Sequence, residues 1–354
     1  MKTRKRKVPG GKMWDHHLRG LIGQASSSYE IVGMPNGGVS GASVVFVRDR
    51  ATKIVRVLKF GEPSLNPQHS ITSQVHNREL LVPLYGDHHL PKVIVANDQA
   101  FLMNMVHGEN LYEVVQHGTV EPRYLQSLTE LVLWKFTEVW KKTKVPFRSC
   151  GELARDPLKR FDRIQGSLYG RSFGGVVLEK YLDTPLCING QSLPCLREIF
   201  AGMSSLYVSP KWVVTCHGDP NGENILIDRD YGWWLLDWEW TGLHDWRVVA
   251  SFFTGWWISN ASLVRRSSMT LQNGKLVVNY ELVVDELATV IIDQAWKFAE
   301  QAAVDFSEDN WREQVTLQIA TLLLGDIRFL EERKRPGHDI SLLGEGVRLL
   351  ASLL

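Results

Sequence analysis

The chain has 354 residues, of which 44% are hydrophobic and 22% are charged, so it can bury a sizeable core as one large domain or two ordinary ones. Lys and Arg total 40 against 39 acidic residues, and this balance excludes a bulk attraction to nucleic acid or to a membrane surface. The basic start is not followed by a signal-peptide apolar segment, and the longest apolar run, 248–258, is too short to cross a bilayer. We therefore expect a soluble, cytoplasmic protein without nucleic-acid or membrane partners.

The first seven residues, MKTRKRK, carry five positive charges. A solvated tail is the simpler interpretation of such a run, and an anionic partner is the alternative. We assign residues 1–28 to this basic tail and a leading segment. The four cysteines form no C-x-x-C pair and no close group with histidine, so neither a zinc site nor a disulfide framework is indicated.

Residues 29–106 have the pattern of short strands and glycine-rich turns. The β-branched runs ASVVFVRD and KIVRVLKF are separated by a turn at 48–52, which predicts a hairpin. A helix is predicted over 70–81, and the runs KVIVAND and AFLMNMV predict a second strand pair joined near Asn97 and Asp98. The expected result is a small, mostly antiparallel sheet with one helix.

After Gly108 the pattern becomes helical. Pro122 begins a segment with apolar residues at helical spacing, and two more long amphipathic helices are predicted over 280–304 and 309–332. Asn273 and Gly274 lie between apolar runs and indicate a tight hairpin turn. A β-rich N-terminal lobe therefore precedes a larger helical lobe.

The stretch CHGDPNGENILIDRDYGWWLLDWEW combines polar side chains with two apolar strands. Asn224 directly precedes the strand NILI, and Asp237 ends its partner WWLLD. In an antiparallel pair an amide oxygen and a carboxylate would converge there, and oxygen ligands of this kind suit Mg²⁺. Asp219 in the preceding loop could accept a hydroxyl proton or orient a nucleophile, which is what phosphoryl transfer requires.

Asp, Asn and Gly are also ordinary turn formers, so a purely structural loop is the alternative. The apolar strand after Asn224, the second acid at the end of a hairpin and the β-rich region upstream favour the catalytic interpretation.

HGDPNGENILI followed by LLDWE resembles the catalytic loop and metal motif of the aminoglycoside phosphotransferase and choline kinase family. The resemblance implies an α+β, bilobal, protein-kinase-like fold, with a small β-rich N-terminal lobe at 29–106 and a larger helical C-terminal lobe at 107–354. It implies Asp219 as catalytic base, Asn224 and Asp237 as Mg²⁺ ligands, and His217 as a residue that shapes the loop. The order of the two lobes resembles the family over about 29–330, but only the segment 217–245 carries sequence motifs specific to the family.

Kinase-like folds hold nucleotide phosphates with a glycine-rich turn, a strand lysine and a helix glutamate. The lysine is expected at Lys59, and Arg56 is the competing candidate, which should face the opposite way. Glu79 is the expected partner of Lys59. The remaining nucleotide contacts are expected at the turn residues Gly37, Gly38, Ser40 and Gly41 and at the connector residues Met103 and Met105.

The chain departs from protein kinases and from the family pattern. Asn221 stands where protein kinases carry a lysine, and Trp238 follows the metal aspartate in place of phenylalanine, so a peptide substrate is disfavoured. Asp245 matches the next family aspartate but is followed by Trp246 and not by proline. We expect Asp245 to brace the catalytic loop by hydrogen bonds.

The prediction is a Mg²⁺-dependent phosphotransferase that uses ATP or GTP and acts on a hydroxyl of a small molecule, such as an aminoglycoside, sugar, amino alcohol or nucleoside. A catalytically inactive nucleotide-binding module of the same fold and a protein kinase are the alternatives. The candidates for the acceptor pocket are a helix at 151–169 and the C-terminal helices from Tyr280 onward. The cations of the first segment form a solvated face or bind an anionic acceptor: Arg155, Lys159, Arg160 and Arg163. The sequence does not predict the oligomeric state.

Overall fold

A computed structural model describes residues 13–34, 43–61, 70–118, 120–329, 335 and 337–354. The chain forms two compact units: the first unit is Met1–Glu109 with Leu226–Thr241, and the second unit is Asn110–Ile225 with Gly242–Leu354. The first unit is rich in strands and the second in helices, so the predicted α+β class is confirmed. The sequence did not predict that 226–241 belongs to the first unit.

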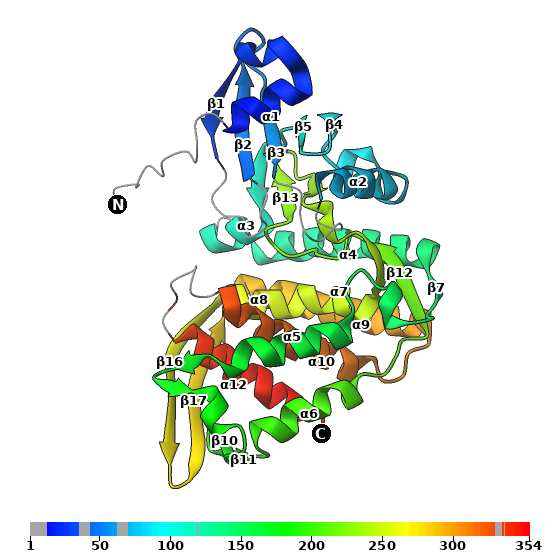
Figure 1. Ribbon diagram of the computed structural model, residues 1–354. Coiled ribbons are helices and arrows are strands. Elements are labelled where there is room, and N and C mark those ends of the chain that lie inside the picture. The colour runs from blue at the N-terminus through cyan, green and yellow to red at the C-terminus, as the bar shows by residue number, and fades with distance from the viewer. Residues whose placement is uncertain (1–12, 35–42, 62–69, 119, 330–334, 336) are drawn as a thin grey trace. The chain divides into compact units, whose positions relative to one another are not determined.

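The described residues of the first unit form an antiparallel sheet of five strands in the order β1-β2-β3-β5-β4 (Figure 1). Its strands are β1 (Tyr29–Gly33), β2 (Ser43–Asp49), β3 (Val55–Phe60), β4 (Val93–Ala96) and β5 (Ala100–Asn104). The helix α2 (Ile71–Tyr85) lies between β3 and β4 in sequence and begins at Ser70, whose side chain accepts a hydrogen bond from the Ser73 amide. Both predicted strand pairs and the predicted helix are present.

Residues 13–28, predicted to be part of a tail and leading segment, are helical. They form α1 (Met13–Ile22) and a 3₁₀ helix, η1 (Gly23–Ser28). Leu18 of α1 is fully buried against Leu58 and Phe60 of β3, and the His17 ring stacks on Phe60. The sequence analysis missed α1 because a ten-residue helix owes its stability to the sheet on which it packs.

The first unit is completed by a hairpin from the middle of the chain. The hairpin consists of β13 (Ile225–Asp228) and β14 (Trp233–Leu235) and is followed by the 3₁₀ helix η6 (Trp238–Trp240). β13 also pairs with β6 (Gly108–Asn110), and β14 contacts the 3₁₀ helix η3 (Asp87–His89). The strands pair in the order β14-β13-β6. The hairpin predicted from NILI and WWLLD is therefore present.

The second unit is mainly helical and contains a three-stranded sheet, in which β12 lies between β15 and β7, and a four-stranded sheet in the order β11-β10-β17-β16. The helices α4 and α9 pack together, and α10 packs against α7 and α12 (Figure 1). Helices and helical turns are α3 (Leu111–His117), α4 (Pro122–Thr143), η4 (Cys150–Glu152), α5 (Pro157–Tyr169), η5 (Leu178–Tyr181), α6 (Leu196–Leu206), α7 (Trp246–Ser251), the π-helical η7 (Phe252–Trp256), α8 (Trp257–Asn260), α9 (Glu286–Phe306), α10 (Trp311–Asp326), η8 (Ile327–Phe329) and α12 (His338–Ala351). Strands are β7 (Val145–Pro146), β8 (Ser172–Phe173), β9 (Val176–Val177), β10 (Leu186–Ile188), β11 (Gln191–Leu193), β12 (Trp212–Cys216), β15 (Gly242–Asp245), β16 (Ser262–Gln272) and β17 (Lys275–Val284).

Two helices of the second unit begin later than the sequence pattern predicted. The helix predicted from 280 begins at Glu286, because residues 280–284 continue β17 and Asp285 caps α9. The helix predicted from 151 begins at Pro157, where Asp156 is the N-cap. None of the helices in the described part of the chain is both long and apolar enough to cross a membrane.

Candidate active site

Lys59 lies on β3 and is 6% exposed. Side chains alternate along a strand, so Leu58 and Phe60 face the core beneath α1 while Lys59 faces the opposite side of the sheet. There its ammonium group bonds to Asp237 Oδ1 at 2.7 Å. The competing cation, Arg56, instead donates to Asn104 Oδ1 at 2.6 Å. Within the first unit, the structure thus brings together the predicted phosphate-binding lysine and one predicted metal ligand.

Asp237 lies between β14 and η6 in a left-handed conformation, with φ 59° and ψ 73°. Aspartate is among the few residues other than glycine that adopt this region readily. The next residue, Trp238, is buried, and its carbonyl accepts a hydrogen bond from Asn77 of α2 at 2.8 Å. This anchoring holds Asp237 with one carboxylate oxygen on Lys59 and leaves Oδ2 for a further ligand.

The predicted pair between Lys59 and Glu79 is absent. Glu79 is exposed on α2 and bonds to the guanidinium of its neighbour Arg78 at 2.8 Å, while Lys59 pairs with Asp237. The buried polar side chains of α2 with amide or charged groups are instead Gln74 and Arg78. Helical spacing sets residues 74 and 78 on one face and turns Glu79 about 100° away from it.

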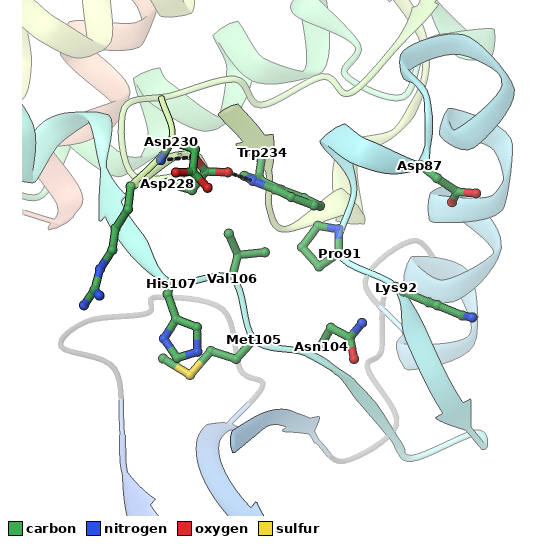
Figure 2. Close-up of a pocket in the computed structure, with 11 residues that line it drawn as sticks. Asp87, Pro91, Lys92, Asn104, Met105, Val106, His107, Asp228, Asp230 and Trp234 are labelled. Carbon is green, nitrogen blue, oxygen red and sulfur yellow. Dashed lines mark hydrogen bonds between the residues drawn. The ribbon is translucent and has the colours of Figure 1, made fainter. Parts of the chain in front are cut away.

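The connector residues differ in their environment. Met103 pairs with Val57 on one side and with Val93 on the other, so it lies inside the sheet. Met105 and Val106 follow β5 and line a pocket of about 800 Å³ within the first unit (Figure 2). Of the two predicted connector residues, Met105 lines this pocket and Met103 does not.

The same pocket is bordered by the β13–β14 turn. Figure 2 shows the Asp228 carboxylate bonded to Trp234 Nε1 at 2.8 Å, and it also accepts from the Asp230 and Gly232 amides. The Trp234 hydrogen bond is the main reason that the pKa of Asp228 is lowered. Asp228 thus closes the hairpin turn, and neither Lys59 nor Asp237 is among the pocket's lining residues. The predicted turn residues Gly37, Gly38, Ser40 and Gly41 lie outside the described residues.

The predicted catalytic loop, 217–224, lies in the second unit and follows β12 directly. Gly218 has φ 79°, which permits the sharp turn after the strand. The buried His217 ring accepts a hydrogen bond from the Asp219 amide at Nδ1, at 3.3 Å. His217 thereby has the kind of contact expected of a residue that shapes the loop.

Asp219 is held by two side chains of the second unit. Asn221 Nδ2 donates to Asp219 Oδ1 at 3.2 Å, and Arg155 forms an ion pair with Oδ2 at 3.2 Å. The side-chain oxygen of Asn221, Oδ1, also accepts hydrogen bonds from the backbone amides of Glu223 and Asn224, so this one side chain links both ends of the turn. Asp219 is 19% exposed and can therefore be reached by an acceptor.

Asn224 donates its side-chain Nδ2 to the Asp219 carbonyl at 2.9 Å. This bond orients the amide so that its oxygen remains for a cation. Mg²⁺ takes oxygen ligands, and one amide oxygen with one carboxylate is a ligand set that it completes with water and substrate phosphates. The donor chemistry of Asn224 and of Asp237, each in its own unit, therefore fits the implied metal.

We predicted that Asp245 would brace the catalytic loop by hydrogen bonds, but its side chain bonds to Arg247 and Tyr207 instead. It is fully buried, and its carboxylate accepts from Arg247 Nε and Nη2 at 2.9 and 2.8 Å and from the Tyr207 hydroxyl at 3.1 Å. Burial is the largest single effect on Arg247 and lowers its pKa, but the charge and hydrogen bonds of Asp245 together with the charges of Tyr207 and Glu308 raise the pKa above its ordinary value. The link to the loop passes through the backbone, because Asp245 on β15 pairs with Val213 on β12.

The sequence analysis did not assign roles to Arg155 on Asp219 or to Asn221 as the bridge of the loop. A third missed residue is Gly222, where an added Cβ would lie 2.7 Å from the Trp256 ring and 2.8 Å from the Trp257 ring. The two glycines of HGDPNGEN, Gly218 and Gly222, were visible in the sequence as positions where the backbone turns sharply or approaches another group closely. Nothing local in the sequence indicated that Arg155, sixty-four positions away, contacts Asp219.

No protein-family model matches the chain, and no curated protein matches it. Solved structures do match. An ethanolamine kinase from Plasmodium vivax is 12% identical with a TM-score of 0.50, and the match covers 94% of this chain and 84% of that one. A choline kinase from Cryptosporidium parvum is 11% identical with a TM-score of 0.52, covering 92% and 88%.

A third match is the GDP complex of wild-type aminoglycoside 2'-phosphotransferase-IIIa, which is 13% identical with a TM-score of 0.50, covering 92% of this chain and 93% of that one. At these identities the matches establish the fold, which this chain shares with these small-molecule kinases. The fold that the resemblance implied is therefore confirmed.

Proposed function

We propose that the protein is a Mg²⁺-dependent kinase that transfers the terminal phosphoryl group of ATP or GTP to a hydroxyl of a small molecule. The observation that carries this proposal is the catalytic loop, in which Asn221 and Arg155 hold the partly exposed carboxylate of Asp219 while Asn224 presents an amide oxygen. The structural matches named as kinases and as a GDP-bound phosphotransferase support the same reaction class.

Asp219 is assigned as the catalytic base. The acceptor oxygen forms a bond to the terminal phosphorus, the bond from that phosphorus to the bridging oxygen breaks, and the nucleoside diphosphate leaves with the electron pair. The hydroxyl proton goes to an Asp219 carboxylate oxygen. Positioning of the hydroxyl and stabilisation of charge account for most of the rate in this reaction type.

The proposed metal ligands are Asn224 of the second unit and Asp237 of the first unit, which precede and follow the β13–β14 hairpin in the sequence. When bound, Mg²⁺ neutralises developing charge on the phosphate oxygens. Lys59 would hold the α and β phosphates, Met105 and Val106 would contact the base, and the glycine-rich segment with Gly37, Gly38, Ser40 and Gly41 is proposed from the sequence to supply further phosphate contacts.

Asp219→Ala tests the assignment. We expect kcat for acceptor-dependent diphosphate release to fall roughly a thousandfold, because general-base catalysis contributes about 10²–10⁴-fold. Nucleotide affinity, measured by calorimetry, should be retained because Asp219 acts on the acceptor. Asp183→Ala, which removes an exposed carboxylate of the second unit, is the matched control and should keep wild-type kcat.

Undiminished turnover in Asp219→Ala would exclude Asp219 as the base. Wild-type protein that binds neither ATP nor GTP would contradict the kinase proposal altogether. Wild-type protein that binds nucleotide but shows no Mg²⁺-dependent hydrolysis or transfer would support the inactive nucleotide-binding module.

A further inference from the structure

The four cations that the sequence places around the start of α5 have different environments. Lys159 is 76% exposed, and Arg163 is also exposed, so these two form a solvated face. Arg155 is only 17% exposed and contacts Asp219. Arg160 carries a guanidinium nitrogen, Nη1, that is buried and has no hydrogen-bond partner. The basic segment is therefore only partly a solvated face.

Arg160 is held inside the second unit. It lies on α5, and a Cβ added to Gly325 of α10 would lie 3.8 Å from Arg160 Nη2. Burial, the largest cause, and the positive charges of Arg155, Arg328 and Arg163 together lower the pKa of Arg160 to about 9, against the opposing effect of Asp326. A buried donor without a partner lowers stability, so its retention suggests that a ligand supplies the partner.

Arg155 interacts electrostatically with Arg160 and also contacts the proposed catalytic base, Asp219. Its guanidinium lies over the Phe252 ring at 4.7 Å and reaches Asp219 Oδ2 with Nη2 at 3.2 Å. The Ala154 amide donates to the Leu243 carbonyl of β15, which anchors the segment before Arg155. Guanidinium groups suit carboxylate and phosphate because their N–H donors match two oxygens at once.

We propose that the acceptor carries an oxyanion, a carboxylate or a phosphate, near the hydroxyl that is phosphorylated, and that Arg155 and Arg160 bind this oxyanion beside Asp219. This inference rests on the proposed kinase function and names its substrate class. The excess of positive charge around Arg160 disfavours amino alcohols and aminoglycosides, whose ammonium groups would be repelled there.

Anion binding is measured first, independently of turnover. Inorganic phosphate at millimolar concentration is added to the full-length protein, and the shift in melting temperature is recorded for each protein against its own phosphate-free value. We expect stabilisation of the wild type and of Lys159→Gln, the exposed-cation control, and loss of most of it in Arg155→Gln and Arg160→Gln.

Because Lys59 could also attract phosphate, the same shift is measured in Lys59→Met. The shift should persist there, since Lys59 belongs to the nucleotide residues of the first unit. The use of two arginine variants covers the case in which Arg160→Gln alone folds poorly, because Arg155 is less deeply buried. Equal stabilisation of all variants, or none in the wild type, would overturn the proposal.

The acceptor class is then read from compounds with one carbon skeleton: glycerate and glycerol 3-phosphate as anions, glycerol as the neutral form, and 3-aminopropane-1,2-diol as the cation. We expect kcat/KM for diphosphate release to be at least about tenfold higher with an anion than with glycerol, and lower still with the amine. The ratio between the two anions distinguishes carboxylate from phosphate recognition.

Arg155→Gln should remove the preference for the anion while nucleotide affinity is unchanged. Preference for the amine, or faster turnover of neutral acceptors in Arg155→Gln, would show that Arg155 shields Asp219 and would overturn the inference while the kinase proposal stands. Absence of nucleotide binding in the wild type would instead count against the kinase proposal, and the phosphate shifts would still report on the two arginines.

Discussion

Asp219 has a different partner on each carboxylate oxygen: Asn221 contacts Oδ1 and Arg155 contacts Oδ2. The two partners differ in kind, because Asn221 belongs to the same loop while Arg155 comes from the segment before α5. The loop amide therefore orients the carboxylate locally, and the guanidinium adds a charge that an acceptor can displace or share. At the scale of single residues, both the orientation of the Asp219 carboxylate and the charge beside it depend on these two partners.

A second pair, Asp245 with Arg247, is fully buried on both sides. Arg247 also donates to the Val208 carbonyl at 2.6 Å, so it joins three parts of the second unit. Burial raises the pKa of Tyr207 next to this pair, and the Asp245 charge adds to that shift, so the Tyr207 hydroxyl stays protonated and donates to Asp245.

Arg247→Met should reduce the free energy of unfolding by about 3–5 kcal/mol, because it leaves the Asp245 carboxylate buried without its cation. The measurement is guanidinium-induced unfolding followed by tryptophan fluorescence. The matched control is Arg265→Met, which breaks an exposed ion pair with Glu281 and should cost less than about 1 kcal/mol. Equal losses in the two variants would contradict the assignment of Arg247 as a buried structural cation.

At the scale of elements, β12 positions the catalytic loop. It is held between β15 and β7, and its last residue, Cys216, directly precedes His217. Cys216 is fully buried, and burial raises the pKa of its thiol to about 12. The strand therefore ends in an uncharged, inaccessible thiol immediately before the polar loop.

Cys216 predicts a measurable pH effect. The folded pKa of about 12 lies above the ordinary value of 9.0, so the folded state retains the proton that the unfolded state loses between these values. The contribution of this thiol to stability is complete below about pH 9 and is lost as the pH rises toward 12. Cys216→Ala should thus show a smaller fall in the free energy of unfolding between about pH 8 and 10.5 than the wild type.

Alkylation measures independently how accessible the Cys216 thiol is at the end of β12. In the native protein at neutral pH, iodoacetamide followed by mass spectrometry should modify the partly exposed Cys187 and Cys195 and leave Cys216 unmodified until denaturant is added. Rapid modification of native Cys216, together with an unchanged pH slope in Cys216→Ala, would refute the burial argument.

At the scale of the whole molecule, the first unit is built from two distant parts of the chain. Residues 226–241 supply Trp233, which stacks on His89 at 3.7 Å, and Trp238, which stacks on Phe101 at 6.2 Å. They also supply Asp237, the partner of the buried Lys59. The strand-rich unit is therefore complete only after the hairpin has been synthesised.

A chain of residues 1–109 alone is expected not to unfold cooperatively, because it lacks the buried Trp233, Leu235 and Trp238 and leaves Lys59 without its carboxylate. The control joins residues 1–109 through a Gly–Ser linker to residues 226–241 and should restore a cooperative transition. Circular dichroism during thermal unfolding measures both. Identical cooperative transitions in the two proteins would show that the hairpin is dispensable for the first unit.

Much of the local structure could be predicted from the sequence. The Asn273–Gly274 turn, Pro122 at the start of α4 and the β13–β14 hairpin follow from residue preferences that act over a few positions. The face of Lys59 also followed from strand alternation. The starts of α5 and α9 were misplaced, although Asp156 and Asp285 were visible capping residues.

The sequence by itself determined which side chains lie in the catalytic loop and on which side of β3 the lysine points, because those properties depend on chain order and on the two-residue repeat of a strand. Only the tertiary structure decided the partners: Asp237 for Lys59 in place of Glu79, Arg247 for Asp245, and Arg155 for Asp219. Charge pairing acts over a few ångströms in space, and the packing of distant segments determines which charges come that close.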